Sequence, residues 1–241
     1  MNSCVACGYN SYTFDAGAIF GTGTNGAYVE DINKITKLAD SSKPPNAKHM
    51  IVNCEWGAFN NNVRCWFFDN FLSLPAYVVY GSQRTILPST PYDNKLDRES
   101  INPRYQAYEK FISGMYLGEI TRNLMLSLVD ASPPVLFRGS STSSLNSHYG
   151  FDSAIMSDME NASSIEEARQ VLVDKVGFAP EVVTNTDAEI ALWACHIVAK
   201  RAAKLSACAV AAVLVQTGYA KLGGSGNDSD TSKIAVGVDG R

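Results

Sequence analysis

LDRESINPRYQAYEKFISGMYLGE, residues 96–119, is the most informative stretch of the chain. The apolar residues that follow its Asn-Pro pair recur at spacings of three and four, which is typical of one face of a helix. We predict a helix that begins shortly after this pair and ends at about Val129. Glu109 lies beside the apolar face, so its carboxylate could point into a cleft, although a surface position is the alternative. Gly114 and Gly118 predict close packing of another element against this helix.

Two segments upstream place polar groups at the ends of predicted strands. Residues 14–20 form a short apolar run that ends in the glycine-rich sequence GTGTNG at 21–26, which predicts a strand followed by a tight turn. Residues 50–52 predict a second, buried strand, and it delivers Glu55 just past its end. In α/β sheets, groups that bind ligands gather at strand ends in this way.

The glycine turn and Glu55 each allow a functional and a structural interpretation. Glycines let backbone N–H groups approach phosphate oxygens, and the hydroxyl of Thr22 adds a donor. The turn is neither a Walker loop nor a protein-kinase glycine loop, and Gly-Thr turns are common in any fold. A carboxylate such as Glu55 accepts hydrogen bonds from two adjacent hydroxyls, which suits a sugar. An isolated glutamate at a strand end is more often solvated or paired with lysine.

The second half of the chain reads mainly as helix. Ser164 with Glu167 predicts a capping box for a helix that ends near residue 177. Thr186 with Glu189 predicts another, which opens the longest helix of the chain and ends at Gly218. The residues expected to point inward from this helix are Ile190, Trp193, Ile197 and Leu205. A last strand is expected at residues 234–238, so the predicted class is α/β.

Composition excludes several classes of protein. The chain has 241 residues, which is room for one large domain or two small ones, and 46 % of them are apolar, which is enough for a real core. A net charge of −4 does not indicate the basic surface that binds nucleic acid. No apolar run is long enough to span a membrane. Six cysteines without a signal peptide suggest a reducing, cytoplasmic location. Cys4 and Cys7 lack a second ligand pair, so we expect small buried side chains there and not a zinc site.

Taken together, GTGTNG at 21–26, CEWGAF at 54–59 and the stretch 96–119 resemble the hexokinase family, the fungal glucokinases most of all. The resemblance implies an actin-like ATPase (ribonuclease H-like) α/β fold, with residues 1–241 as part of the large lobe. It implies a transferase that phosphorylates glucose or a related hexose at the 6-hydroxyl, the first step of glycolysis. ATP and Mg²⁺ are the implied cofactors, and the hexose and ATP are the implied partners.

The resemblance also implies roles for particular residues. The implied ligands of the hexose are Asn25, Glu55 and Glu109. The implied contacts to nucleotide phosphate are Gly21, Thr22 and Gly23. The family's catalytic base belongs to an Asn-Asp-Thr segment that would lie upstream of Met1, so we expect neither a catalytic base nor a metal ligand within this chain. Where the family places adenosine contacts, this sequence has Lys200, Ala207 and Ala209, so none of those contacts is transferred.

Residues 63–83 are aromatic-rich, show no clean alternation, and interrupt the resemblance. Without them, residues 58–62 would join residues 84–88 as in related sugar kinases. We hypothesise that the segment is a retained intron, and the alternative is a true loop insertion. Two other functions stay open beside the kinase. One is a non-catalytic, regulatory relative that binds sugar, and the other is a fragment without function, since losing half a core is costly at a net stability of about 5–15 kcal/mol.

Overall fold

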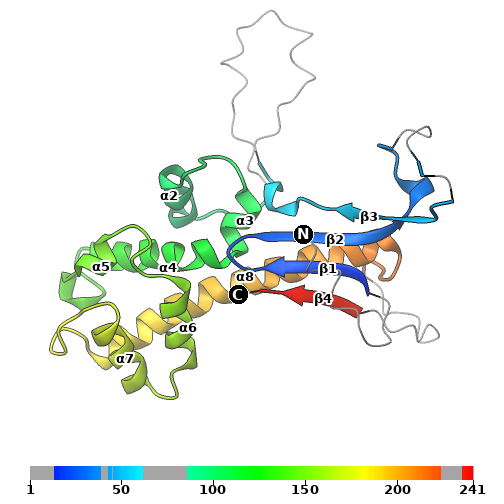
Figure 1. Cartoon of the computed structure of the whole chain (residues 1–241). Coiled ribbons are helices and arrows are strands. Elements are labelled where there is room, and N and C mark those ends of the chain that lie inside the picture. The colour runs from blue at the N-terminus through cyan, green and yellow to red at the C-terminus, as the bar shows by residue number, and fades with distance from the viewer. Residues whose placement is uncertain (1–13, 39–42, 45, 62–85, 224–234, 241) are drawn as a thin grey trace, which may run out of the picture.

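A four-stranded sheet and a group of helices occupy opposite ends of the structure, and one long helix runs from one to the other (Figure 1). The computed structural model describes residues 14–38, 43–44, 46–61, 86–223 and 235–240. The segment 63–83 and the Cys4 and Cys7 pair lie outside the described residues. Within the described residues, three strands come first, the α-helices follow in one run, and a fourth strand comes last, so the chain contains both classes as the α/β prediction requires.

The sheet has the strand order β3-β2-β1-β4. Its strands are β1 (Phe14–Phe20), β2 (Thr24–Asp31), β3 (His49–Asn53) and β4 (Ala235–Asp239). The pairs β1–β2 and β2–β3 are antiparallel, and β1–β4 is parallel. The strand predicted over residues 14–20 is therefore confirmed, and the last strand is confirmed to within one residue.

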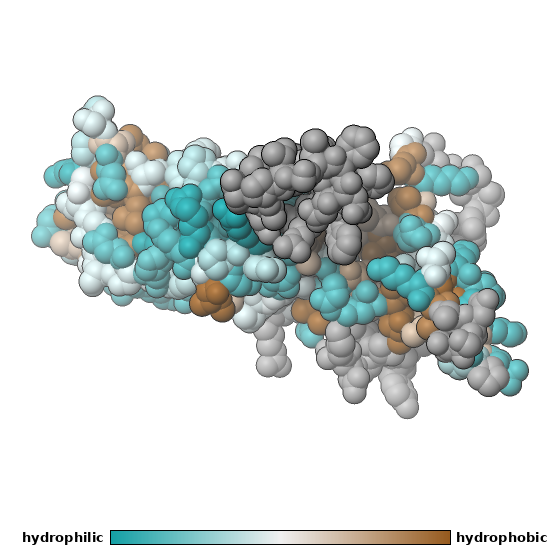
Figure 2. All heavy atoms as spheres, turned by 90° about the horizontal axis from the view of Figure 1, so that it is seen from above, coloured by the Kyte–Doolittle hydropathy of each residue, from teal (hydrophilic) through white to brown (hydrophobic). Residues whose placement is uncertain are grey.

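The prediction that residues 50–52 form a buried strand is wrong in one respect. The strand exists, but Met50 is 44 % exposed and Ile51 is 51 % exposed. β3 lies at the edge of the sheet, whereas the long helix packs on β1 and β2. An apolar run predicts a strand, but it does not tell whether another layer covers that strand. On the face seen in Figure 2, hydrophobic residues come to the surface at the sheet end.

The helical part contains short helices and one long one. They are α2 (Pro91–Glu99), α3 (Ala107–Ile112), α4 (Gly114–Val129), α5 (Ser143–Asn146), α6 (Ser153–Asn161), α7 (Ile165–Asp174) and α8 (Asn185–Thr217). Short 3₁₀ turns lie at η1 (Ile32–Lys34), η3 (Trp56–Ala58) and η5 (Phe137–Gly139).

The single helix predicted up to Val129 is in fact two helices, α3 and α4. Ser113 interrupts it with an extended backbone (φ −86°, ψ 148°). The break frees the N–H of Gly114, which donates to the carbonyl oxygen of Gly21 in the glycine turn over 2.8 Å. The second glycine packs as predicted, because a Cβ on Gly118 would lie 2.3 Å from the carbonyl oxygen of Phe151. A long-range contact thus decides where the helix breaks.

Helix α8 ends at Gly218 as predicted, in a left-handed conformation (φ 87°), but it begins two residues early. Its capping box is Thr184 with Asp187, and not Thr186 with Glu189. The side chain of Asp187 is buried and also accepts the N–H of Phe137 over 2.7 Å. This tertiary contact selects one of two overlapping Thr-x-x-acid patterns.

The buried face of α8 also differs from the prediction. Trp193 is 53 % exposed, and Ile190, Ile197 and Leu205 are only partly buried. The buried face consists of small residues, which let α4 and α7 approach closely: Ala188, Ala191, Ala194, Cys195, Val198 and Ala202. Large apolar residues were therefore a poor guide to the inner face of this helix.

Replacing the capping residue Thr184 by alanine should lower the free energy of unfolding by about 1 kcal/mol, because the N–H of Asp187 loses its acceptor. Thr186→Ala is the matched control, since Thr186 is exposed and does not cap the helix. We expect that control to stay within about 0.5 kcal/mol of the unmodified chain in urea unfolding. Equal losses for the two variants would contradict the assigned cap.

Candidate functional site

The glycine turn joins β1 to β2 and is held from two sides. The N–H of Gly21 donates to the carbonyl oxygen of Gly23 over 2.9 Å, and the oxygen of Gly21 accepts the N–H of Gly114. Thr22 is exposed. Among the described residues, no hydrogen bond uses the N–H of Thr22 or of Gly23. The turn therefore presents two backbone donors and one hydroxyl to a ligand, which fits an anionic phosphate.

The end of β4 lies against the start of this turn. A Cβ on Gly240 would come within 2.5 Å of the carbonyl oxygen of Phe20. Phe20 is the last residue of β1, the strand that pairs with β4. The parallel strands β1 and β4 thus end together, at the edge of the sheet where the turn lies.

The predicted sugar ligands Asn25 and Glu55 contact each other directly. The Nδ2 of Asn25 donates to Oε1 of Glu55 over 3.1 Å, and to Oδ1 of Asn53 over 2.8 Å. Glu55 is exposed and has a left-handed backbone (φ 50°, ψ 39°). Such a conformation is costly for a residue with a side chain, and it is found often at ligand sites.

Glu109, the third predicted ligand, reaches the same place from helix α3. Its Oε2 accepts the backbone N–H of Thr24 over 3.0 Å, one residue before Asn25. A Cβ on Gly23 would lie only 2.8 Å from this oxygen. The structure therefore brings Asn25, Glu55 and Glu109 together beside the glycine turn, although they are up to 84 residues apart in sequence.

Trp56, which the sequence analysis did not single out, contacts both strands that flank the glycine turn. The Nε1 of Trp56 donates to Oγ1 of Thr24 over 2.8 Å, and this hydroxyl donates to the carbonyl oxygen of Ile19. The indole ring stacks on Phe20 at 5.8 Å between centroids and leaves no room for a Cβ on Gly26. Asn53 was missed as well. Both residues belong to or flank the CEWGAF motif, which was the available signal.

Burial raises the pKa of two groups that border the site. The thiol of Cys54 has its pKa raised by burial and by the charge of Glu55. The hydroxyl of Tyr116 has its pKa raised by burial, and further by Glu109 and Tyr149. Both groups therefore stay protonated and neutral near pH 7, so the charge of this site comes from its carboxylates.

A small apolar cluster beneath the site connects it to the helices. Its buried members are Leu87, Tyr108, Phe111, Ile112 and Ala202, with Phe20 and Trp56 packed against them. The hydroxyl of Tyr108 donates to the carbonyl oxygen of Leu205 on α8. The segment that carries Glu109 is thus fixed to the long helix.

We expect alkali to weaken this cluster. Burial, and to a lesser degree the charge of Cys208, raises the pKa of Tyr108 to about 12. In the unfolded chain the tyrosine hydroxyl has a pKa of about 10. The contribution of Tyr108 to stability is therefore fully present below pH 10 and is lost as the pH rises toward 12. The loss should be on the order of 2 kcal/mol. Tyr108→Phe should make unfolding free energy fall less steeply over this window, and an unchanged slope would contradict the assignment.

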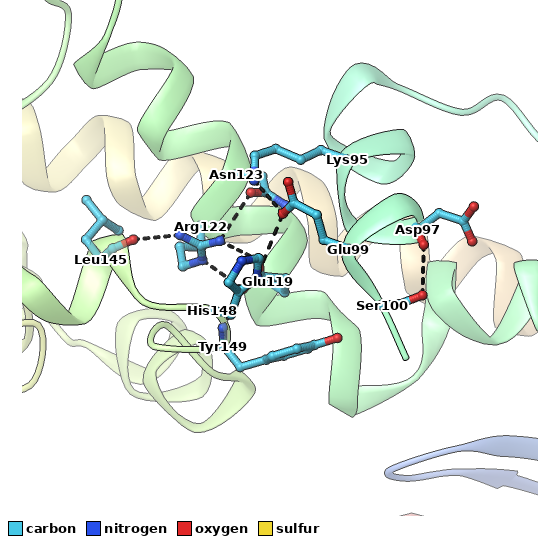
Figure 3. A network of polar contacts seen from close by, with 10 residues as sticks. All are labelled: Lys95, Asp97, Glu99, Ser100, Glu119, Arg122, Asn123, Leu145, His148 and Tyr149. Carbon is cyan, nitrogen blue, oxygen red and sulfur yellow. Dashed lines mark hydrogen bonds and ion pairs between the residues drawn. The ribbon is translucent and has the colours of Figure 1, made fainter. Parts of the chain in front are cut away.

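A second polar cluster groups Glu99, Glu119 and His148, whose potential metal-ligand atoms lie within 4.8 Å of one another (Figure 3). Both oxygens of Glu119 already accept N–H groups of Arg122, and one also accepts the N–H of Tyr149. Lys95 pairs with Glu99. Two carboxylates and two cations leave no net charge to attract a metal ion, so this cluster is structural.

Comparisons with known proteins identify the family of the chain. The family model described as hexokinase matches residues 15–71 and 78–241. A glucokinase of Aspergillus niger is 37 % identical over 215 residues, which are 84 % of this chain and 39 % of the relative. The hexokinase-3 of Rattus norvegicus is 35 % identical over 89 % of this chain and 20 % of its own length.

A solved structure has a similar fold. The hexokinase of Schistosoma mansoni complexed with glucose superposes with a TM-score of 0.74 at 28 % identity, over 97 % of this chain and 44 % of that chain. The chain belongs to the hexokinase family and has its actin-like ATPase fold. It spans less than half the length of each of these relatives. Within the described residues, no helix is both long and apolar enough to cross a membrane.

Proposed function

We propose that this chain provides the hexose site and the phosphate-binding turn for ATP-dependent phosphorylation of glucose, or a related hexose, at the 6-hydroxyl. The observation that supports this proposal most is that the three predicted sugar ligands lie close together. Asn25 bonds Glu55 directly, and Glu109 holds the neighbouring residue Thr24. Two carboxylates and an amide at one strand end can accept and donate hydrogen bonds to neighbouring hydroxyls of a neutral sugar.

The glycine turn suits the phosphates of ATP. Its N–H groups at Thr22 and Gly23 and the exposed hydroxyl of Thr22 are donors, and Gly23 keeps the backbone close to Glu109. ATP supplies the transferred phosphoryl group when bound, and Mg²⁺ would be held by its phosphates and not by a side chain of this chain. The role of these residues is to bind and orient the two substrates next to each other.

Titration of the chain with glucose tests the proposal. We expect binding, and a loss of about 10- to 100-fold in affinity for Glu55→Gln and for Glu109→Gln, because each removes a charged acceptor. Glu166→Gln is the matched control, since Glu166 is an exposed residue of α7 whose ion pair, among the described residues, is with Arg169 on its own helix. Absence of glucose binding, or equal losses for all three variants, would refute the proposal.

Isotope-traced phosphorylation of glucose separates the kinase from the alternative. Turnover above background, lost in Glu55→Gln, would support a catalytic chain and contradict the expectation that the catalytic base lies outside it. Binding without turnover favours the non-catalytic sugar-binding relative, which uses the same three ligands but needs no base.

A further inference from the structure

We propose that Asn53 is a positioning residue for Glu55. It holds one carboxylate oxygen of Glu55 by a hydrogen bond, so that the other oxygen is left for a sugar hydroxyl. The inference rests on the function proposed above for this site. Asn53 is the last residue of β3 and contacts both Asn25 and Glu55.

The hydrogen bonds of this trio run in one direction. The Nδ2 of Asn25 donates to Oδ1 of Asn53 over 2.8 Å, and the Nδ2 of Asn53 donates to Oε1 of Glu55 over 2.5 Å. Asn25 also donates to the same Oε1. In the described part of the chain, no hydrogen bond reaches the other oxygen, Oε2. One oxygen of Glu55 is thus doubly bonded by the protein, and the other is left for a ligand.

The orientation of both amides is fixed by these bonds. The Oδ1 of Asn25 accepts the backbone N–H of Gly26 over 2.8 Å, so its Nδ2 must face Asn53 and Glu55. If the amide of Asn53 were turned over, its NH₂ group would face that of Asn25, and its oxygen would face the carboxylate. Both contacts would be repulsive, so only one orientation satisfies all groups.

The sheet register places Asn53 where it can do this. Asn53 pairs with Ala27 across the β2–β3 ladder, and Asn25 lies two residues earlier on β2, on the same face. The N–H of Cys54 then donates to the carbonyl oxygen of Gly26 over 2.8 Å. The backbone is therefore fixed on both sides of Asn53, up to the residue before Glu55.

This arrangement gives Asn53 a distinct role when sugar binds. Both amide hydrogens of Asn25 are already used, so a hydroxyl that takes one of them must displace a bond within the trio. When the bond between Asn25 and Glu55 is exchanged for the sugar, Asn53 still holds Oε1. Glu55 then keeps Oε2 directed at the hydroxyl without having to be reordered.

The test compares Asn53→Asp and Asn53→Ala in glucose titrations across pH. Asn53→Ala should weaken binding about 10-fold at every pH, because one hydrogen bond to a charged group is lost. Asn53→Asp should weaken it about 100-fold at pH 8, because two carboxylates then face each other. Binding by Asn53→Asp should partly recover on acidification, when one of the two carboxyls takes a proton and again donates. The matched control is Asn33→Asp, since Asn33 makes a similar bond to Asp31 away from the site.

A second readout needs no sugar. The side-chain amide signal of Asn25 in nitrogen-15 NMR should move in Asn53→Asp and in Glu55→Gln, and stay in place in Asn33→Asp. If the unmodified chain does not bind glucose while this signal responds, the proposed function fails and the positioning role stands. If the signal does not respond, or if Asn53→Asp binds glucose as the unmodified chain does at all pH values, the positioning role is refuted.

Discussion

Replacing Arg122 by alanine should lower the free energy of unfolding by about 3–5 kcal/mol. Arg122 and Glu119 are each 2 % exposed, and the guanidinium donates to both carboxylate oxygens, through Nε over 2.7 Å and through Nη2 over 2.5 Å. Its third nitrogen donates to the carbonyl oxygen of Leu145 (Figure 3). Alanine would leave a buried carboxylate without its cation and a buried carbonyl without its donor.

Urea unfolding measures this effect, and Lys175→Ala is the control. Lys175 pairs with Asp158 at an exposed position, so we expect a loss of no more than about 1 kcal/mol there. The double variant Glu119→Ala with Arg122→Ala should lose less than the sum of its two single variants, because neither charge is then left alone. A single variant Arg122→Ala as stable as the unmodified chain would show that water reaches Glu119.

Local sequence signals located the parts of the fold that local chemistry determines. The apolar run before the glycine turn gave β1, and a glycine that tolerates a left-handed backbone marked the end of α8 at Gly218. The grouping of Asn25, Glu55 and Glu109 was also predicted, but through family motifs. No spacing rule would join a residue on a strand, a residue just past another strand and a residue on a helix.

The features that the sequence did not reveal depend on long-range contacts. Helix α3 ends at Ser113 because Gly114 bonds the glycine turn, and α8 begins early because Asp187 bonds Phe137. Trp193 is exposed because small residues line the helix interface. The sequence did not single out Asn53, whose partners lie 28 residues upstream and two residues downstream.

Adding one methyl group at Gly26 should disrupt the candidate sugar site, with a loss of glucose affinity of about 100-fold and of stability of about 1–3 kcal/mol. A Cβ there would lie 2.3–2.8 Å from three atoms of the Trp56 ring. The ring cannot yield easily, because Phe20 stacks on it and Thr24 accepts its N–H. The displacement is therefore transmitted to Glu55, the preceding residue.

Gly57→Ala tests whether this effect is specific to the ring contact. Gly57 follows Trp56 directly, but a Cβ there would first meet the flexible amide of Gln106, at 3.3 Å. We expect Gly57→Ala to weaken glucose binding much less than Gly26→Ala does, with both measured by calorimetric titration. If the two variants bind glucose equally well, then Trp56 does not hold Glu55 in place. In that case the conformation of Glu55 depends on its bonds to Asn25 and Asn53 alone.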